Sequence, residues 1–387
     1  MSWKRDLRLW RNKPLQPNDK SKRRFTKLKR RNNPMKRRNK KIKRRLISLL
    51  LCTLFATSCS KRETQSDKTL FGDDKTEKEQ ITIHRFEQAL FAPSKQTTEQ
   101  HLLSIEKNFK PMFAASLGDK QYMAVVKAFV EDTEMKKVYN VVKQHYPDMK
   151  FLEDALSEAL PKIRKIHRDT CKTDIYTLIV GPAEYSFVYQ NRILVYPEFS
   201  TISIDAYCMD SLSEHPYYKS MPKYLQTTLT RDNIAPDYIR TYLQEITFKD
   251  IPLQNQNPDA TLLDCIIDDG KYSYAVAALL PKTPLHNILR YTEEQQKWVE
   301  DNEYNIWSYI IQNRLLYNKD RTKYLSLIAE GPTTKGITGS PSRIGNYIGY
   351  RIVQAYMGKN PITLDSLFRT ADSELILKAS EYKPQKR

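Results

Sequence analysis

The sequence predicts a predominantly α-helical α+β fold with one small β-sheet. Apolar residues recur at helical spacing through most of 99–170 and again from residue 235 toward the C-terminus. Between these regions, 174–207 changes to the β-branched and alternating pattern that is typical of strands. Because 81–387 is long enough to bury one large core, we expect it to form a single globular domain.

The first helical region carries one clear apolar stripe. Ile81 and Ile83 alternate as in a short strand, and the pattern turns helical toward Leu90. Farther on, apolar side chains recur with a period of about 3.6 residues, at Phe151, Leu152, Ala155, Leu156, Ala159, Ile163 and Ile166. Pro161 lies inside this stripe, and we expect it to kink the helix or to divide it in two.

The middle of the chain predicts the sheet. The segments with strand patterns are 174–180, 185–189, 192–196 and 201–207. The second and third of them flank Gln190-Asn191, which favours a β-hairpin. We therefore expect three or four strands in one sheet.

The C-terminal part is helical again. The expected helices are 235–246, 260–267, 272–280, 292–315 and 342–357. Thr292 is followed three residues later by Gln295, which is a capping-box pattern. Gly345 and Gly349 lie four residues apart on one face of the last helix, where they would let a neighbouring helix approach closely.

An apolar segment near the N-terminus indicates a targeting signal. Residues 46–56 are uncharged and mostly apolar, but they are too short to span a bilayer, which takes about 20 residues. A basic run precedes them, as in a secretory signal. Ala56-Thr57-Ser58-Cys59 resembles the lipobox of bacterial lipoproteins, which implies that 35–58 is a removed signal peptide and that Cys59 carries fatty acids such as palmitate. The alternative is an ordinary secretory signal with an incidental cysteine.

The charge distribution argues against nucleic acid as a partner. The whole chain carries +19, but residues 1–45 alone hold this net charge, and residues 60–387 contain 43 basic and 43 acidic side chains. A basic arm for nucleic acid would be cleaved off with the signal. Met35 begins an ordinary basic n-region, so we interpret 1–34 as an extension ahead of the true start. Residues 59–80 are then the lipidated cysteine and a polar, flexible tether.

Residues that could perform chemistry form no known motif. None of the six histidines lies in H-E-x-x-H, and neither G-x-S-x-G nor a P-loop is present. Asp205, Asp210 and His215 fall close together after the last expected strand, and they are the weak candidates for a metal site. We expect no catalytic residues, no cofactor and no enzymatic activity.

Three cysteines remain in the mature chain besides Cys59. An exported bacterial lipoprotein lies in the cell envelope, which is an oxidising compartment. One pair among Cys171, Cys208 and Cys265 could therefore be bridged, with one thiol left over. No C-x-x-C pattern suggests a zinc knuckle or a thioredoxin-type site. The mature chain also lacks a second apolar run long enough to span a membrane.

Several stretches, in order, resemble the GldB family of gliding-motility lipoproteins. The similarity covers most of 81–384 and is densest in 264–384. The matching stretches are Arg85-Phe86-Glu87, Leu90-Phe91, Gly270-Lys271 with Tyr274 and Leu279-Leu280-Pro281, Thr292 to Gln296 with Trp298, Asn302-Glu303, Ile306-Trp307, Leu315-Leu316-Tyr317 with Asp320, Ser340 to Gly349, Leu375 to Lys378, and Tyr382-Lys383-Pro384.

This resemblance implies a cell-envelope lipoprotein of Gram-negative gliding bacteria, attached to the membrane by its lipid and facing the periplasm. Its partners would be other envelope proteins of the gliding machinery, and no catalysis is assigned to the family. Lys271 and Arg343 are the candidate partner-binding residues, because a cation beside a helix start seldom serves packing. The alternative is that both form structural salt bridges. The other functional class is an envelope hydrolase, a metal-dependent peptidase with an unrecognised site.

The family also resembles, more remotely, predicted zinc proteases that carry H-E-x-x-H on one helix and an E-G pair on a later helix. The corresponding segments here are 235–245, which holds no histidine, and Asp269-Gly270. The resemblance therefore implies a degenerate, metal-free zinc-protease-like scaffold. Such a scaffold could hold a peptide segment against the edge of its sheet.

Overall fold

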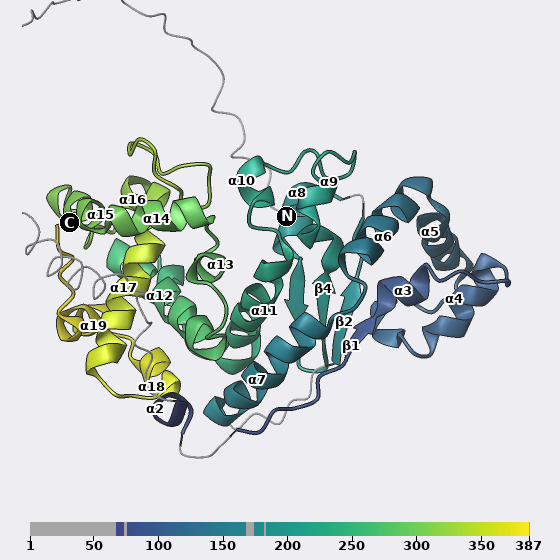
Figure 1. Ribbon diagram of the computed structural model, residues 1–387, viewed down its shortest axis with the longest axis horizontal. Helices are drawn as coiled ribbons and strands as arrows, with labels where there is room; N and C mark the ends of the chain where they lie inside the picture. Colours follow the sequence, from purple (N-terminus) through teal and green to yellow (C-terminus); the bar gives the residue numbers. More distant parts are fainter. Residues whose placement is uncertain (1–66, 73–75, 168–173, 182, 387) are drawn as a thin grey trace, which may run out of the picture. The chain divides into compact units, whose positions relative to one another are not determined.

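The computed structural model describes residues 67–72, 76–167, 174–181 and 183–386. The chain divides into two units, 1–62 and 63–387, and all described residues belong to the second. The expected extension, signal peptide and lipidated Cys59 lie outside the described residues. The described part is mostly helical and contains one small mixed sheet, which confirms the predicted fold class (Figure 1).

Four strands form the sheet: β1 (Ile83–Arg85), β2 (Asp174–Leu178), β3 (Ile193–Val195) and β4 (Phe199–Ser203). Their order is β1-β2-β4-β3, with β2 parallel to both β1 and β4, and with β3 antiparallel to β4. Ile175 pairs with Ile83 on one side and with Ser200 on the other. The central residues of β2 are buried, as is usual for a parallel strand that is covered on both faces.

A buried ion pair attaches the first strand to the sheet. Arg85 Nε donates to Glu87 Oε1 at 2.6 Å, and Glu87 Oε2 accepts from the hydroxyl of Thr177 on β2 at 2.6 Å. The same guanidinium donates to the backbone oxygen of Tyr146 at 3.0 Å. Because Glu87 is fully buried, removing either charge would leave the other unpaired in the interior. The stretch Arg85-Phe86-Glu87 is therefore structural.

In the sequence, helices precede β1, separate the strands and follow β4. Those before β3 are α2 (Asp67–Phe71), α3 (Phe86–Leu90), α4 (Thr98–Glu106), α5 (Lys120–Glu131), α6 (Thr133–His145), α7 (Lys150–His167) and α8 (Tyr185–Gln190). Those after β4 are α9 (Met209–Leu212), α10 (Lys223–Gln226), α11 (Ile234–Tyr242), α12 (Leu262–Leu279), α13 (Leu285–Leu289), α14 (Glu293–Asp301), α15 (Glu303–Gln312), α16 (Arg321–Ile328), α17 (Ile344–Lys359), α18 (Leu364–Arg369) and α19 (Ser373–Ser380). Short 3₁₀ helices occur at Lys110–Met112, Ile204–Tyr207, Arg231–Asn233 and Gln254–Gln256, and α11 continues into a π-helical turn, Leu243–Thr247. None of the described helices is both long and apolar enough to cross a membrane.

The expected hairpin around Gln190-Asn191 is wrong. Residues 185–190 form helix α8, and the hairpin joins β3 to β4 instead. A short apolar run satisfies the strand and helix patterns equally well, so its period could not separate the two. Likewise, 201–207 is only partly a strand, because β4 ends at Ser203 and a 3₁₀ helix follows.

Two helix boundaries also differ from the expectation. Segments 260–267 and 272–280 belong to one helix, α12, which is buried on nearly all sides and therefore shows no clear amphipathic stripe. Segment 292–315 contains two helices, α14 and α15, separated at Asn302, whose side chain donates to Trp298 O at 2.9 Å. The capping box at Thr292 is confirmed.

Helix α7 carries the predicted apolar stripe without interruption. Leu152, Leu156 and Ile163 are buried, and Pro161 lies inside the helix without dividing it. Helix α2 packs against α7, and its Leu70 is buried. The expected tether 59–80 therefore includes a helix that is docked on the folded part.

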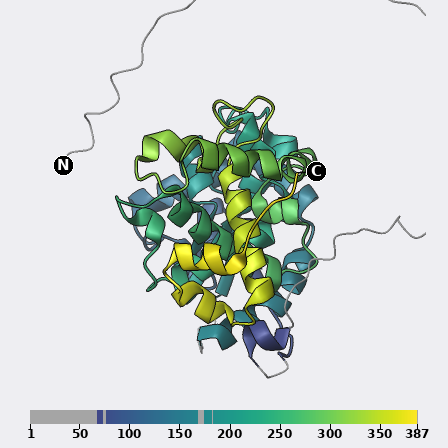
Figure 2. The ribbon, with the colours of Figure 1, turned by 90° about the vertical axis from the view of Figure 1, so that its left-hand side faces the viewer.

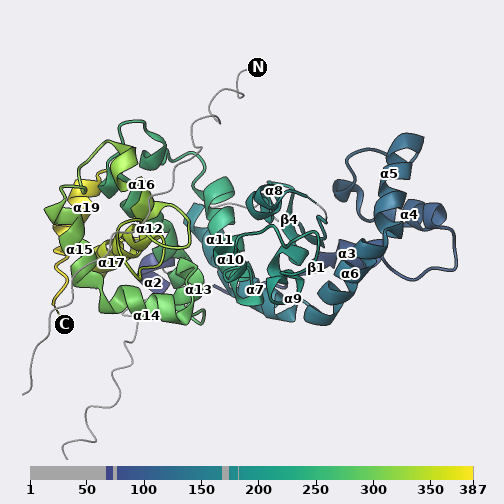
Figure 3. The same cartoon turned by 90° about the horizontal axis from the view of Figure 1, so that it is seen from above.

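Helices α12 and α17 lie side by side, with their backbones in contact (Figures 1 and 3). A Cβ on Gly270 would lie 2.5 Å from the carbonyl carbon of Gly349, and a Cβ on Gly349 would lie 1.8 Å from Ile266 O. Only glycine fits these positions, so the packing interpretation of Gly349 is confirmed. Helix α19 packs against α17 and is drawn in yellow with it in Figure 2.

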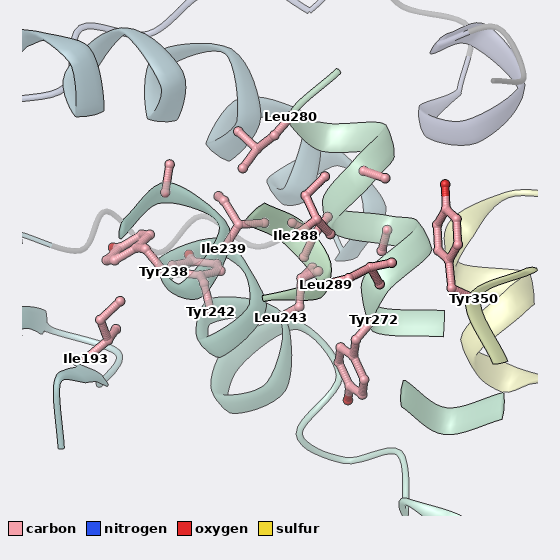
Figure 4. Packing of buried hydrophobic residues seen from close by; sticks show 14 of the residues in the cluster. Ile193, Tyr238, Ile239, Tyr242, Leu243, Tyr272, Leu280, Ile288, Leu289 and Tyr350 are labelled. Atoms are coloured by element: carbon pink, nitrogen blue, oxygen red, sulfur yellow. The ribbon is translucent and has the colours of Figure 1, made fainter. Parts of the chain in front are cut away.

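The main core continues from the sheet to these helices through α11. Ile239 and Leu243 pack with Ile288 and Leu289 of α13 in one apolar cluster (Figure 4). The hydroxyl of Tyr238 lies 2.9 Å from Ser200 Oγ on β4. A smaller cluster forms among α3, α4 and α5.

Two of the three cysteines have a defined state. Cys208 and Cys265 are buried free thiols, so they are not bridged to each other. Burial raises the pKa of both thiols, which keeps them protonated and unreactive at neutral pH. Cys171 lies outside the described residues.

Gly349→Ala should destabilise the fold. The new methyl would overlap Ile266 O, and the helices would have to separate, at a cost of about 1–3 kcal/mol in the free energy of unfolding. Gly358→Ala is the matched control on the same helix, because no atom lies within 4 Å of its added Cβ. Chemical denaturation of both variants measures the difference. Equal stability of the two variants would contradict the close contact of α12 and α17.

Candidate functional site

Asp205 is a structural carboxylate. It is fully buried and accepts hydrogen bonds from Tyr218 Oη at 2.6 Å and from the backbone N–H groups of Val180 and Gly181 at 3.2 Å. Burial raises the pKa of Asp205, and these donors act in the opposite direction. The side chain therefore holds the segment after β2 beside the 3₁₀ helix that follows β4.

Asp210 and His215 point to other partners. Asp210 Oδ2 lies 3.0 Å from His145 Nε2, and His215 Nε2 lies 3.2 Å from Glu134 Oε2. The structure thus does not bring Asp205, Asp210 and His215 together as a ligand set, because Asp210 and His215 bind residues at opposite ends of α6 and Asp205 binds Tyr218 and the backbone after β2. Within the described ranges, no group of three His, Cys, Asp or Glu side chains is placed to hold a metal ion.

Lys271 is buried inside the fold. Its Nζ donates to the backbone oxygen of Thr370 at 2.8 Å, which ties α12 to the segment after α18. Burial lowers the pKa of Lys271, although the carboxylates of Asp268 and Asp264 act to raise it. A cavity of about 400 Å³ lies beside this side chain, with Tyr272 and Phe368 in its wall. Lys271 therefore stabilises the fold and does not offer its charge to a partner on the surface.

Arg343 stands at the start of α17 in a left-handed conformation, with φ of +56°. Its Nη2 donates to the backbone oxygen of Arg290, its own backbone oxygen accepts from Tyr291 Oη at 2.9 Å, and its guanidinium lies 5.5 Å from the centre of that ring. Neither Lys271 nor Arg343 makes a salt bridge in the part of the chain that is described; both bind carbonyl oxygens instead.

Arg343 lines a second, polar pocket of about 280 Å³. Side chains from α11, α12, α13, α17 and the segment before β3 form its wall. The charged members are Arg192, Asp237, Arg240, Asp269, Arg290, Glu330 and Arg343. Four arginines and three carboxylates therefore line one small cavity. We take this arginine pocket as the candidate functional site.

Asp237 is the centre of the charge network. It is buried on α11 and accepts hydrogen bonds from Arg192 Nε at 2.9 Å and Tyr207 Oη at 2.8 Å. Arg290 Nε lies 3.8 Å from its other oxygen. Burial by itself would raise the pKa of Asp237, but the two arginines outweigh burial and lower the pKa to about 2. The carboxylate is therefore ionised at neutral pH.

A second ion pair closes the pocket between α11 and α12. Arg240 Nη2 binds Asp269 Oδ1, and Arg240 Nη1 donates to Ser273 Oγ at 3.1 Å. These are the two segments that the zinc-protease resemblance aligned with H-E-x-x-H and the later E-G pair. The structure brings them together, and it fills the space between them with guanidinium groups. Arginine cannot ligate a cation, so this arrangement does not fit a metal.

Sequence reasoning missed most of this pocket. Arg192, Arg240 and Arg290 belong to no motif, and their carboxylate partners come from distant segments. One signal was available, because Arg240 and Asp237 interrupt an otherwise apolar segment of α11. Charged side chains inside a buried helix need partners, and their presence indicates a polar site.

A comparison with models of known protein families identifies the family of this chain. The model described as "Gliding motility protein GldB" matches residues 71–384. The chain belongs to the GldB family. The match extends from the end of α2 to beyond α19, so it includes both α12 and α17 and the whole arginine pocket. No curated protein matches, and no solved structure matches.

Other GldB-like stretches of the sequence are structural as well. The buried Glu303, from Asn302-Glu303, accepts hydrogen bonds from Tyr347 Oη at 3.2 Å, Arg351 Nε at 3.0 Å and Tyr382 Oη at 2.9 Å. This one carboxylate joins α15, α17 and the C-terminal Tyr382-Lys383-Pro384. The expected likeness to a zinc-protease scaffold stays a prediction, since no solved structure matches.

Asp237→Asn should lower the free energy of unfolding by about 3–5 kcal/mol at pH 7, because two buried arginines lose their counter-charge. Asp301→Asn is the control, since Asp301 is half exposed and pairs only with Lys297 at the surface, where a change below about 0.5 kcal/mol is expected. Urea titrations measure both.

The same variant tests the pKa of Asp237. This pKa is below the ordinary value of 3.8. The ionised carboxylate therefore contributes its full stabilisation above about pH 4, and this contribution is lost as the pH falls toward about 2. The stability gap between wild type and Asp237→Asn should therefore narrow between about pH 4 and pH 2. A gap of constant size across that range would show that the carboxylate is not held ionised by the arginines.

Proposed function

We propose that this GldB-family protein is a cell-envelope lipoprotein of the gliding-motility type and acts there as a non-catalytic scaffold or interaction component. The observation that carries this proposal is the family match over 71–384. The apolar segment 46–56 and Cys59 support a lipid anchor on a chain that faces the periplasm. Its partners are the membrane, through the lipid, and envelope proteins of a gliding-type machinery.

The docked helix α2 restricts how far the folded part can lie from that lipid. Only residues 60–66 separate Cys59 from the start of α2. Seven residues span at most about 25 Å when fully extended. The proposed scaffold therefore works close to the membrane face, where partners with short periplasmic segments can reach it.

The arginine pocket supports a non-catalytic role. Its carboxylates are engaged by arginines, and Asp237 is ionised but enclosed between Arg192 and Arg290. The rival function, an envelope hydrolase with a metal at Asp205, Asp210 and His215, would need those side chains to converge, and each one binds elsewhere. A nucleic-acid-binding role would need residues 1–45 in the mature chain.

Cys59→Ala should release the protein from the membrane or stall its processing, because three acyl chains would contribute about 0.8 kcal/mol per buried CH₂. Cys52→Ala is the matched control, a second cysteine in the same signal that should leave processing unchanged. Fractionation and intact-mass measurement distinguish the outcomes. In a gliding host, Cys59→Ala should also abolish spreading. A Cys59→Ala protein that fractionates and migrates like wild type would refute the anchor.

Purified protein should contain far less than one zinc ion per chain, and His215→Ala should not change its metal content. Elemental analysis of the full chain, purified without chelator, provides the measurement. One tightly held zinc per chain that is lost in His215→Ala would refute the scaffold and favour the hydrolase.

A further inference from the structure

Two arginines that line the arginine pocket have guanidinium N–H groups without a hydrogen-bond acceptor. Nε and Nη2 of Arg290 and Nε of Arg343 are shielded from solvent and have no hydrogen-bond partner within the described structure. Arg290 Nε is held only in the ion pair with Asp237, 3.8 Å away, which is too long for a hydrogen bond. Asn346 Oδ1, in the same pocket, is also unpartnered. Buried guanidinium N–H groups are costly to leave unpaired, and native proteins rarely do so. The unpaired N–H groups of Arg290 and Arg343 indicate a missing acceptor, whereas Asn346 Oδ1 is an acceptor and would take a donor.

The backbone at these two arginines is held in place by hydrogen bonds. Arg290 has φ of +59° and Arg343 has φ of +56°, a left-handed conformation that side chains other than glycine rarely adopt. Both residues are bound through their backbone oxygens, Arg290 to the guanidinium of Arg343 and Arg343 to Tyr291. Arg314 and Glu381 have the same backbone conformation away from the pocket, so at Arg290 and Arg343 it fixes the positions of the two side chains.

The charge of the pocket specifies the ligand. Four arginines face three carboxylates, which leaves one excess positive charge when all groups are ionised. Asp237 is ionised, because its arginines lower its pKa to about 2. A ligand with a single negative charge would balance the pocket, whereas a dianion would meet repulsion from Asp237, Asp269 and Glu330.

We propose that this pocket binds one carboxylate group, from a peptide chain or from a small organic acid, through the guanidinium groups of Arg290 and Arg343. A planar carboxylate matches the planar fork of a guanidinium and can accept from two of its N–H groups at once. The volume of about 280 Å³ admits a group the size of one residue. The proposal rests on the pocket alone and would stand if the role in gliding failed.

Glu330 is the most exposed of the three pocket carboxylates. Its side chain is 33% exposed, against 23% for Asp269 and 4% for Asp237. Glu330 lies 3.6 Å from Arg290 Nη1, so the protein places its own carboxylate beside this guanidinium. A ligand carboxylate must compete with it.

Binding is tested on the full chain purified in detergent, by thermal shift and calorimetry. The probes are acetyl-trialanine with a free C-terminus, the same peptide amidated, propionate as a free acid with a single charge, and inorganic phosphate. The free peptide should raise the melting temperature and the amide should not; propionate that binds better than the peptide would identify a free acid as the source. Equal binding of the acid and the amide, no binding of either carboxylate, or tighter binding of phosphate would overturn the proposal.

Variants separate binding from folding. Arg343→Gln should lower the affinity for the carboxylate probe by about tenfold or more. Arg369→Gln should leave this affinity unchanged, since Arg369 is exposed and pairs with Asp365 outside the pocket. Glu330→Gln should tighten binding, because it removes the competing carboxylate beside Arg290. A gain of affinity cannot come from a damaged fold. Unchanged affinity in Glu330→Gln, or equal affinity in Arg343→Gln and Arg369→Gln, would refute the assignment.

Discussion

The contact between the backbones of α12 and α17 is the constraint on which the site depends. Gly270 and Gly349 let the two helices meet without side chains between them. Asp269 and Ser273 flank the contact on α12, and Arg343 and Asn346 begin α17 on the other wall of the pocket. Because packed interiors transmit displacement rather than absorb it, the distance between the two walls is fixed by the glycines.

Within this frame, buried charges determine the shape of the pocket. Such pairs seldom add stability compared with apolar packing, since both ions must be removed from water. They do fix positions: Arg192 and Arg290 share Asp237, and both lie over the ring of Tyr189, at 4.4 and 5.2 Å from its centre. Donors held in this way need little ordering when a ligand arrives, which reduces the entropic cost of binding.

The fold could be predicted from sequence to the extent that local patterns decide it. The stripe of α7, the capping box at Thr292 and the strand at 174–178 all follow from period or capping chemistry. Residues 185–190 could not be assigned, because helix and strand share short apolar runs. The pocket could not be predicted in this way. Its wall is formed by segments between residues 192 and 347 that come together only in the folded structure, and local sequence patterns do not predict such long-range contacts.

The positions of Lys271 and Arg343 in the fold show why their charge alone did not indicate a partner-binding surface. Lys271 and Glu303 are buried and bind neighbouring helices, so the resemblance reports mainly how the scaffold is built. Family membership therefore transfers the fold more directly than it transfers a partner. Arg343 is different, because it combines a structural bond through Nη2 with a free donor at Nε. Arg343 therefore both supports the start of α17 and lines the arginine pocket, whereas Lys271 lines the separate cavity beside Tyr272.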